Sequence, residues 1–217
     1  MVRMPHYQFP TNYVYWENIK EHEYLKAKYM PIIDDIEKRK DTPLKNPFNL
    51  CDISSTSFCD KNTFLSSDDI DKIIWGPLDN FIEEINTNYQ RKIQVKKSII
   101  HSYWFNTYKV GDYQEFHDHN ACRELINNEY YYPVFSGIYI LNDDAKSSSI
   151  IFKSSSILPV PFSITTSSSH NFYTSKESNI KEGSVIIFPC QLEHMVKKCI
   201  KPGRRTIAFN VYSQLSI

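Results

Sequence analysis

The spacing of apolar residues predicts helices in the first part of the chain. Ser66-Ser67-Asp68-Asp69 is a polar cluster suited to a helix N-terminus. After it, apolar residues recur every three or four positions, at Ile70, Ile73, Ile74, Leu78, Phe81, Ile82 and Ile85. This spacing predicts an amphipathic helix from about Asp68 to Tyr89. Glu17–Lys40 is rich in Glu, Lys and Ile, which predicts a second helix, broken near Pro31.

Beyond residue 95 the pattern changes to short strands. Segments rich in β-branched and aromatic residues are separated by turn residues, and they predict strands at Ile99–Val110, Val134–Leu141, Ser149–Phe152, Ser184–Phe188 and Thr206–Tyr212. The Ser-rich stretches 147–156 and 165–169 are typical of loops. Such strands are typical of a sandwich or barrel. We expect a mainly β fold and a single domain, 1–217, in which a helical and mixed segment, 1–95, buttresses a β-rich core, 96–217.

Composition narrows the class of protein. Lys+Arg and Asp+Glu both number 25, so a zero net charge gives no global attraction for nucleic acid or an anionic membrane. The five cysteines are odd in number and form no C-x-x-C pair, which favours reduced thiols in a cytoplasmic compartment. No stretch approaches the roughly 18 apolar residues of a membrane span. The expected protein is soluble and cytoplasmic.

Candidate metal ligands are found among the seven histidines. His117 and His119 form an H-x-H pair, which on a strand places two imidazoles on one face. The pair alone is a weak signal for metal, but its surroundings strengthen it. Tyr108-x-x-Gly111-Asp112 precedes it, and His194 follows the apolar stretch Gly183–Pro189 far downstream.

A strand after His194 offers candidate polar ligand contacts. It begins with Arg204-Arg205-Thr206, ten residues beyond that histidine. Alternation places small and polar side chains on one face, which suits a lined cavity: Arg204, Thr206, Ala208 and Asn210. The opposite face is mostly apolar and comprises Arg205, Ile207, Phe209 and Val211.

This ordered set of motifs resembles the iron(II)/2-oxoglutarate oxygenases. That family has Tyr-x-x-Gly-Asp, His-x-Asp/Glu, a distal His, and Arg-x-Ser/Thr about ten residues later. The chain is similar to a His-x-His subgroup from phages and bacteria in three further segments: Phe9-Pro10-Thr11, Ser136-Gly137-Ile138-Tyr139 and Arg204–Asn210. The resemblance covers about residues 104–212 and implies a double-stranded β-helix, the jelly-roll or cupin-like barrel.

The resemblance also implies a cofactor, a cosubstrate and a reaction. Fe(II) would be held by His117, His194 and one neighbour of His117. Arg204 would pair with the distal carboxylate of 2-oxoglutarate, assisted by Thr206, Tyr108 and Asn210. The implied activity is hydroxylation with O2, coupled to decarboxylation of 2-oxoglutarate to succinate.

The motif departs from the family at two positions. His119 stands where the carboxylate is usual, and Asp118 lies one place earlier. Because His117 and His119 share a strand face, we expect a three-imidazole site of His117, His119 and His194. A bulge after His117 would instead swing Asp118 inward. The second departure is Tyr139-Ile140, where some relatives with peptidyl-proline substrates have Tyr-Tyr.

Two other functions are compatible with the same motifs. One is a cupin-type three-histidine dioxygenase that does not use 2-oxoglutarate, and another is a non-catalytic jelly-roll binding module. The expected substrate is a peptidyl or free amino acid first and a nucleobase second. Asn120–Pro133, with Tyr130-Tyr131-Tyr132, is the expected lid or wall of the site, although packing of these tyrosines on the barrel is favoured. The sequence does not indicate an oligomeric state.

Overall fold

The computed structural model describes residues 13–38, 51–55, 64–89, 100–120, 123–126, 128–143, 148–153, 171–176 and 179–213. Its helical elements are α1 (His22–Lys38), α2 (Ser67–Ile70), a π-helical turn η2 (Asp71–Trp75), α3 (Gly76–Tyr89) and a 3-10 turn η3 (Thr174–Lys176). Its strands are β1 (Tyr15–Asn18), β2 (Cys51–Asp52), β3 (Ser54–Ser55), β4 (Ile100–Tyr108), β5 (Tyr113–His117), β6 (Glu124–Ile126), β7 (Glu129–Asn142), β8 (Ile150–Lys153), β9 (Asn171–Tyr173), β10 (Ser184–Pro189), β11 (His194–Val196) and β12 (Arg204–Ser213). The expected mainly β composition is confirmed. The motif Phe9-Pro10-Thr11 and the loop 165–169 lie outside the described residues.

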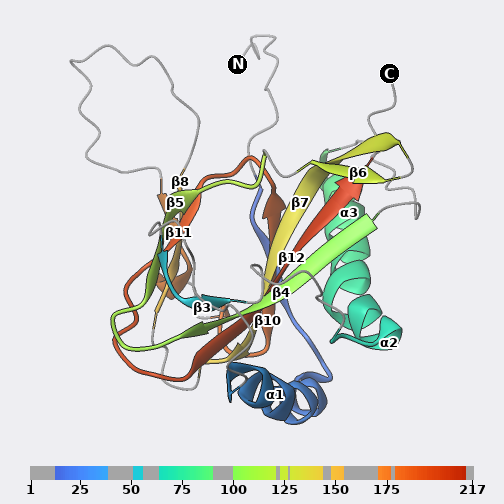
Figure 1. Ribbon diagram of the computed structural model, residues 1–217. Helices are drawn as coiled ribbons and strands as arrows, with labels where there is room; N and C mark the ends of the chain where they lie inside the picture. Colours follow the sequence, from blue (N-terminus) through green and yellow to red (C-terminus); the bar gives the residue numbers. More distant parts are fainter. Residues whose placement is uncertain are drawn as a thin grey trace, which may run out of the picture.

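The strands form two antiparallel sheets (Figure 1). The seven-stranded sheet has the order β1-β10-β7-β12-β4-β3, and β6 pairs with the projecting end of β7. The five-stranded sheet has the order β2-β5-β11-β8-β9. Neighbours in each sheet come from distant parts of the chain, because β10 lies between β1 and β7 and β11 lies between β5 and β8. This interleaving brings the segments around residues 117, 194 and 204 into one region.

Two apolar cores hold these layers together. One lies between the helices and the outer face of the seven-stranded sheet, where α1 and α3 cover it in Figure 1. Its members include Leu25 and Tyr29 of α1, Leu78 of α3 and Phe209 of β12. The other lies between the two sheets and includes Ile138, Ile140, Phe152, Ile186 and Phe188. The candidate chemistry lies on this inner side of the large sheet.

Helix α1 differs from the expected one in its start and in its continuity. Residues Glu17 and Asn18 belong to β1, which pairs with β10, so the helix begins only at His22. The helix then runs through Pro31 without a break. Pro31 is exposed, while Leu25, Tyr29 and Ile33 form the buried face, so the proline ring lies away from the packed side. Among the described residues, no helix is both long and apolar enough to cross a membrane.

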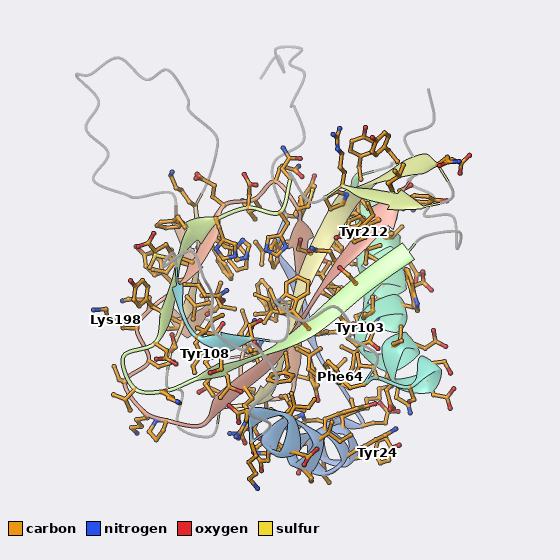
Figure 2. The ribbon with its side chains drawn as sticks, in the orientation of Figure 1. Tyr24, Phe64, Tyr103, Tyr108, Lys198 and Tyr212 are labelled. Atoms are coloured by element: carbon orange, nitrogen blue, oxygen red, sulfur yellow. The ribbon has the colours of Figure 1, made fainter. Side chains whose placement is uncertain are left out.

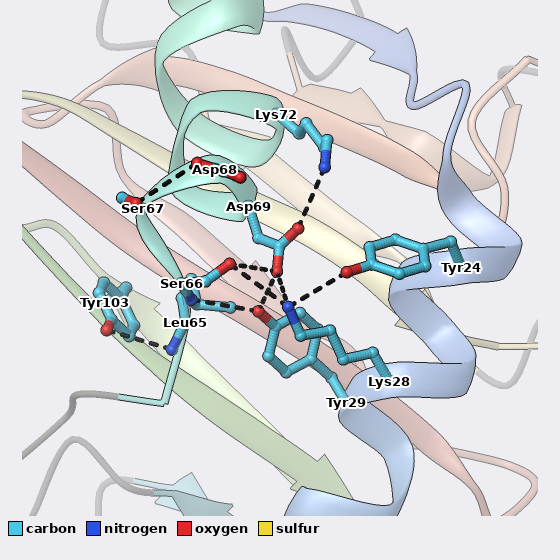
Figure 3. Close-up of polar contacts among 10 residues, drawn as sticks. All are labelled: Tyr24, Lys28, Tyr29, Leu65, Ser66, Ser67, Asp68, Asp69, Lys72 and Tyr103. Carbon is cyan, nitrogen blue, oxygen red and sulfur yellow. Dashed lines mark hydrogen bonds and ion pairs between the residues drawn. The ribbon is translucent and has the colours of Figure 1, made fainter.

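The helix predicted from about Asp68 to Tyr89 is confirmed over Ser67–Tyr89, with a π-helical turn inside it. Its N-terminus is tied to α1 through the carboxylate of Asp69, which is fully buried. Lys28 Nζ and Tyr29 OH of α1 each lie 2.5 Å from Asp69 Oδ2, and Ser66 Oγ donates to the same atom at 2.6 Å (Figure 3). The polar cluster that predicted a helix start therefore also joins two helices.

All five predicted strands are present, with altered boundaries. Strand β7 begins at Glu129, earlier than the predicted Val134, because its first residues pair with β6 as a hairpin. The expected lid, Asn120–Pro133, thus contains a β-hairpin with Asn128 at φ 66° in the turn. Tyr130 of this hairpin is exposed, whereas Tyr131 and Tyr132 are half-buried. The short strands β1, β2, β3 and β9 were not predicted, since two to four residues carry too little alternation.

Candidate metal centre

Two of the three candidate histidines come from paired neighbouring strands. His117 ends β5 and His194 begins β11, and the two residues lie directly opposite each other in the antiparallel register. Their ring centroids are 4.3 Å apart. Phe152 and Phe188 pack around His194, which is 2% exposed. The register of β5 against β11 thus fixes this pair of imidazoles in a largely apolar environment.

The third histidine comes from the turn that follows β5. The backbone N–H of His119 donates to the carbonyl oxygen of Cys190 at 2.9 Å, which anchors the turn. The His119 ring lies 5.4 Å from that of His117 and 5.2 Å from that of His194, between centroids. One ring nitrogen from each of the three histidines lies within 4.8 Å of the other two. Such a cluster can present three imidazole nitrogens to one metal ion.

The Nδ1 atom of each of these histidines has an oxygen partner. It lies 2.7 Å from the Glu115 carbonyl oxygen for His117 and 3.0 Å from the Leu192 carbonyl oxygen for His194. For His119 the partner is Asn210 Oδ1, at 2.6 Å. A carbonyl oxygen can only accept, so each Nδ1 carries the proton. The three Nε2 atoms are then the ring nitrogens available to a metal ion, and a protonated Nδ1 with an oxygen acceptor is the usual support of a histidine ligand.

Asn210 is hydrogen-bonded to His119, whereas the sequence had suggested a contact with the cosubstrate. Its Oδ1 also accepts a hydrogen bond from Ser136 Oγ at 2.8 Å, and Ser136 Oγ lies 3.0 Å from His119 Nδ1. Both Asn210 and Ser136 are buried. The sequence had marked Ser136 within Ser136-Gly137-Ile138-Tyr139 but had given it no role. Together the two residues fix the orientation of the His119 ring.

Asp118 points away from the cluster. Its side chain is exposed, and its Oδ1 accepts a hydrogen bond from the backbone N–H of Asn120 at 3.0 Å. His119 follows on the inner side, so the turn keeps the alternation of His117 and His119 and does not bring Asp118 inward. Within the described part of the chain, the candidate donor set therefore contains three neutral imidazoles and no carboxylate.

The environment favours the neutral form of these imidazoles. Burial lowers the pKa of His117, and burial together with the neighbouring rings lowers the pKa of His194 well below its ordinary value. The pKa of His119 falls to about 4, chiefly through burial and against the raising effect of the Asn210 hydrogen bond. A neutral imidazole is the form that coordinates a metal. At neutral pH the three imidazoles are therefore in the neutral form that can coordinate a metal ion.

A pocket extends from the histidines between the two sheets. Its lining residues come from both sheets and comprise Trp104, Asn106, Tyr108, Gln114, His117, His119, Ile138, Ile150, His194, Val196, Arg204, Thr206 and Ala208. Tyr108 lies at this inner side of the large sheet (Figure 2). Among the described lining residues there are none from the β6–β7 hairpin, the expected lid. Arg204 and Thr206 both line the pocket, as the strand alternation had suggested, and Tyr108 joins them, as the family resemblance had implied.

Several buried polar atoms of this pocket have no hydrogen-bond partner among the described residues. Arg204 is 2% exposed, and its Nη1 forms an ion pair with Asp143 Oδ2, yet its Nε has no partner. The same holds for Thr206 Oγ1 and Asn106 Oδ1. Tyr108 OH donates to Gln114 Oε1 at 2.5 Å, and its ring lies 5.7 Å from the Arg204 guanidinium carbon. Unpaired buried polar atoms are costly, so their clustering suits a polar ligand: Arg204 Nε and the Thr206 hydroxyl can donate to an anionic group, whereas Asn106 Oδ1 can only accept.

The sequence did not single out Asp143, Asn106, Gln114 or Trp104 as site residues. Asp143 directly follows the end of β7, and its place in Asn142-Asp143-Asp144 is typical in sequence of an exposed turn residue. The strand pairing could have indicated Asn106, because it lies opposite Thr206 in the register of β4 and β12. Trp104 shares that face two residues away, and its ring lies 5.9 Å from His119.

Comparison with known proteins shows similarity in fold. No protein-family model and no curated protein matches the chain. A prolyl-4-hydroxylase from Pseudomonas putida is 9% identical, with 94% of this chain and 93% of that chain covered and a TM-score of 0.53. AviO1 from Streptomyces viridochromogenes Tue57 is 11% identical, with coverage of 95% and 92% and a TM-score of 0.56. These likenesses show that the chain shares its fold with these two proteins.

Proposed function

We propose that this protein is an iron(II)- and 2-oxoglutarate-dependent oxygenase. One observation carries the proposal: three imidazoles converge at one end of a pocket whose other end holds the buried, partly unpaired Arg204. A metal site and an anion site in one pocket are what a metal-chelating 2-oxoacid with a second carboxylate requires. We further propose that the two sheets form a double-stranded β-helix and that residues 1–217 form a single domain.

His117, His119 and His194 are the proposed metal ligands, each through Nε2. Fe(II) fits this donor set, and Mn(II) is a redox-stable substitute for it. With 2-oxoglutarate and O2, iron of this kind supplies oxidation of an unactivated C–H bond, coupled to formation of succinate and CO2. The protein holds the three rings through Glu115, Leu192 and Asn210 and surrounds them with apolar side chains.

Arg204 and Thr206 are the proposed contacts to the distal carboxylate of 2-oxoglutarate. The Arg204 Nε and the Thr206 hydroxyl are buried donors without a protein partner, so a carboxylate between them would satisfy both. Tyr108 flanks the guanidinium and lines the same pocket. We assign Asn210 to support of His119, and not to the cosubstrate, because its carbonyl oxygen is used there.

The proposed reaction partners are O2 and a peptidyl or free amino acid, with a nucleobase as the second substrate class. The Trp104 ring lies 5.9 Å from the ring of His119, and the β6–β7 hairpin comes soon after His119 in the chain. On this proposal the substrate approaches the metal from the side of these residues. Mass spectrometry of candidate peptides, amino acids and nucleosides after aerobic incubation would identify the class by a mass gain of one oxygen atom.

A three-histidine dioxygenase without 2-oxoglutarate is the second candidate. Two observations favour it: the donor set contains three imidazoles, and the charge of Arg204 is already partly compensated by Asp143. The two functions differ in one product. The first converts 2-oxoglutarate to succinate, whereas the second oxidises its substrate without it.

The test is metal binding followed by turnover. Protein prepared anaerobically should bind one Fe(II) or Mn(II) per chain, and His194→Ala should abolish this binding. His22→Ala is the control, because His22 lies on α1 and contacts Tyr139 and Glu182 instead. Succinate formation in wild type supports the oxygenase, and its absence with metal bound would favour the second candidate. Equal metal content in wild type and His194→Ala would overturn both, and would favour a non-catalytic binding module.

A further inference from the structure

The buried ion pair between Arg204 and Asp143 engages only one nitrogen of the guanidinium, Nη1. Asp143 Oδ2 accepts from Nη1, and both side chains are almost fully buried, at 2% and 7% exposure. Nε has no partner. A guanidinium can bind a carboxylate bidentately along its Nε–Nη2 edge as well as along its Nη1–Nη2 edge. Asp143 therefore engages Nη1, while Nε, on the other edge, has no partner among the described residues, and Arg204 lines the pocket.

The backbone holds Asp143 in this place. Its N–H donates to Glu182 Oε2 at 2.7 Å, and Glu182 Oε1 in turn lies 2.5 Å from Lys26 Nζ and 3.2 Å from His22 Nε2 of α1. The preceding residue, Asn142, donates from Nδ2 to the Gly203 carbonyl oxygen at 2.5 Å, next to Arg204 itself. These hydrogen bonds connect the end of β7 to the start of β12 and hold the Asp143 carboxylate in place beside the guanidinium.

We propose that Asp143 is a positioning residue, which holds Arg204 so that its Nε–Nη2 edge faces the distal carboxylate of the cosubstrate. The inference rests on the proposed function. Arginine has many rotamers, and a donor that is already fixed loses little entropy when its ligand binds. Asp143 adds a negative charge near an anion site, which is unfavourable in itself, so its benefit lies in geometry. It acts through Arg204 and makes no contact with the cosubstrate.

Binding to the Mn(II)-loaded protein distinguishes positioning from a general structural role. Two ligands are titrated by calorimetry: 2-oxoglutarate, which reaches Arg204, and oxalate, which uses both carboxylates on the metal and does not. We expect Asp143→Ala to weaken 2-oxoglutarate binding about ten- to a hundredfold, in the range typical of lost supporting contacts, and to leave oxalate binding within about twofold. Asp143→Asn keeps an oxygen acceptor for Nη1 and should retain affinity for 2-oxoglutarate within a few fold.

Two further variants sharpen the test. Asp34→Ala removes a carboxylate partner of the neighbouring Arg205 on the opposite face of β12, and should leave both affinities unchanged. In the double variant Asp143→Ala/Arg204→Ala, 2-oxoglutarate should bind no more weakly than in Arg204→Ala alone, because Asp143 acts only through that arginine.

Each outcome has a defined meaning. Equal loss of 2-oxoglutarate and oxalate binding in Asp143→Ala would show a structural role and overturn the proposal. Tighter 2-oxoglutarate binding in both Asp143 variants would show that Asp143 competes with the ligand, and would also overturn it. If wild type binds oxalate but not 2-oxoglutarate, the proposed function itself fails, and the positioning role fails with it.

Discussion

His117 and His194 lie opposite each other on β5 and β11, with their ring centroids 4.3 Å apart. Directly opposed residues in an antiparallel pair keep a short and fixed separation, so this pair needs no loop to bring it together. The third imidazole, His119, depends on a turn and on hydrogen bonds to residues far along the chain. The candidate centre therefore combines a rigid pair with a third group that its surroundings orient.

The first prediction concerns the neighbours of His117. His119→Ala should remove metal binding, because its ring faces the other two imidazoles. Asp118→Ala should retain about one metal per chain, since its carboxylate is exposed and bonded to the Asn120 N–H. Metal content after gel filtration measures both. Loss of metal in Asp118→Ala with retention in His119→Ala would show that the ordinary carboxylate triad forms instead.

Asn210→Ala should weaken metal binding by about ten- to a hundredfold, because it removes the acceptor that fixes the His119 tautomer and ring orientation. At saturating Mn(II), its affinity for 2-oxoglutarate should stay close to that of wild type. Competition with a fluorescent metal chelator gives the first quantity and calorimetry the second. A selective loss of 2-oxoglutarate affinity would instead show that Asn210 contacts the cosubstrate.

Arg204→Ala should weaken 2-oxoglutarate binding more than about thirtyfold, the cost expected for losing a buried bidentate charge contact. Arg205→Ala is the matched control. Its side chain points to the opposite face and pairs with Asp34 and Glu37 of α1, so this variant should lose some stability and keep its affinity. Titration of the two Mn(II)-loaded variants compares them directly. A larger loss for Arg205→Ala would contradict the assigned pocket.

Asp69→Asn should lower the free energy of unfolding by about 1–3 kcal/mol at pH 7, because Lys28 and Tyr29 would lose a buried ionised acceptor. Burial raises the pKa of Asp69, but hydrogen bonds from Lys28, Ser66, Tyr29 and Lys72 outweigh it and lower the pKa below its ordinary value. A lowered carboxyl pKa stabilises the fold above the unfolded pKa of about 4, and this stability is lost as the pH falls further.

The difference in stability between wild type and Asp69→Asn should therefore be constant near neutrality and shrink below about pH 4. Urea unfolding at several pH values measures it. Asp68→Asn is the control at the exposed neighbouring position and should change stability little. A difference that grows in acid would contradict the ionised, hydrogen-bonded state of Asp69.

Gly137→Ala should destabilise the fold by about 1–3 kcal/mol through overpacking. Gly137 lies opposite Phe209 in the register of β7 and β12, and an added Cβ would come within 2.0 Å of the Phe209 ring. Thermal unfolding gives the effect. Combining the change with Phe209→Leu, which removes the ring, should yield a loss smaller than the sum of the two single losses; strict additivity would show that the close approach is unimportant.

Periodicity identified the parts of this structure that depend on local geometry. The helix over Ser67–Tyr89 followed from apolar residues every three or four positions, and the opposite facing of Arg204 and Arg205 followed from strand alternation. The helical break at Pro31 was wrong, because the proline lies on the exposed face of α1, where water can reach the backbone carbonyl that loses its hydrogen bond. The early start of β7 was missed, since pairing with β6 provides its hydrogen bonds.

By itself, the sequence determined which side chains share a face, and so placed His117 with His119 and Arg204 with Thr206. Only the tertiary structure decided which residues meet across the sheets. The register of β5 on β11 brought His194 to His117, and the pairing of β7 with β12 brought Asp143 to Arg204. The reason is physical: alternation is a property of one strand, whereas register and burial depend on how all strands and helices pack together.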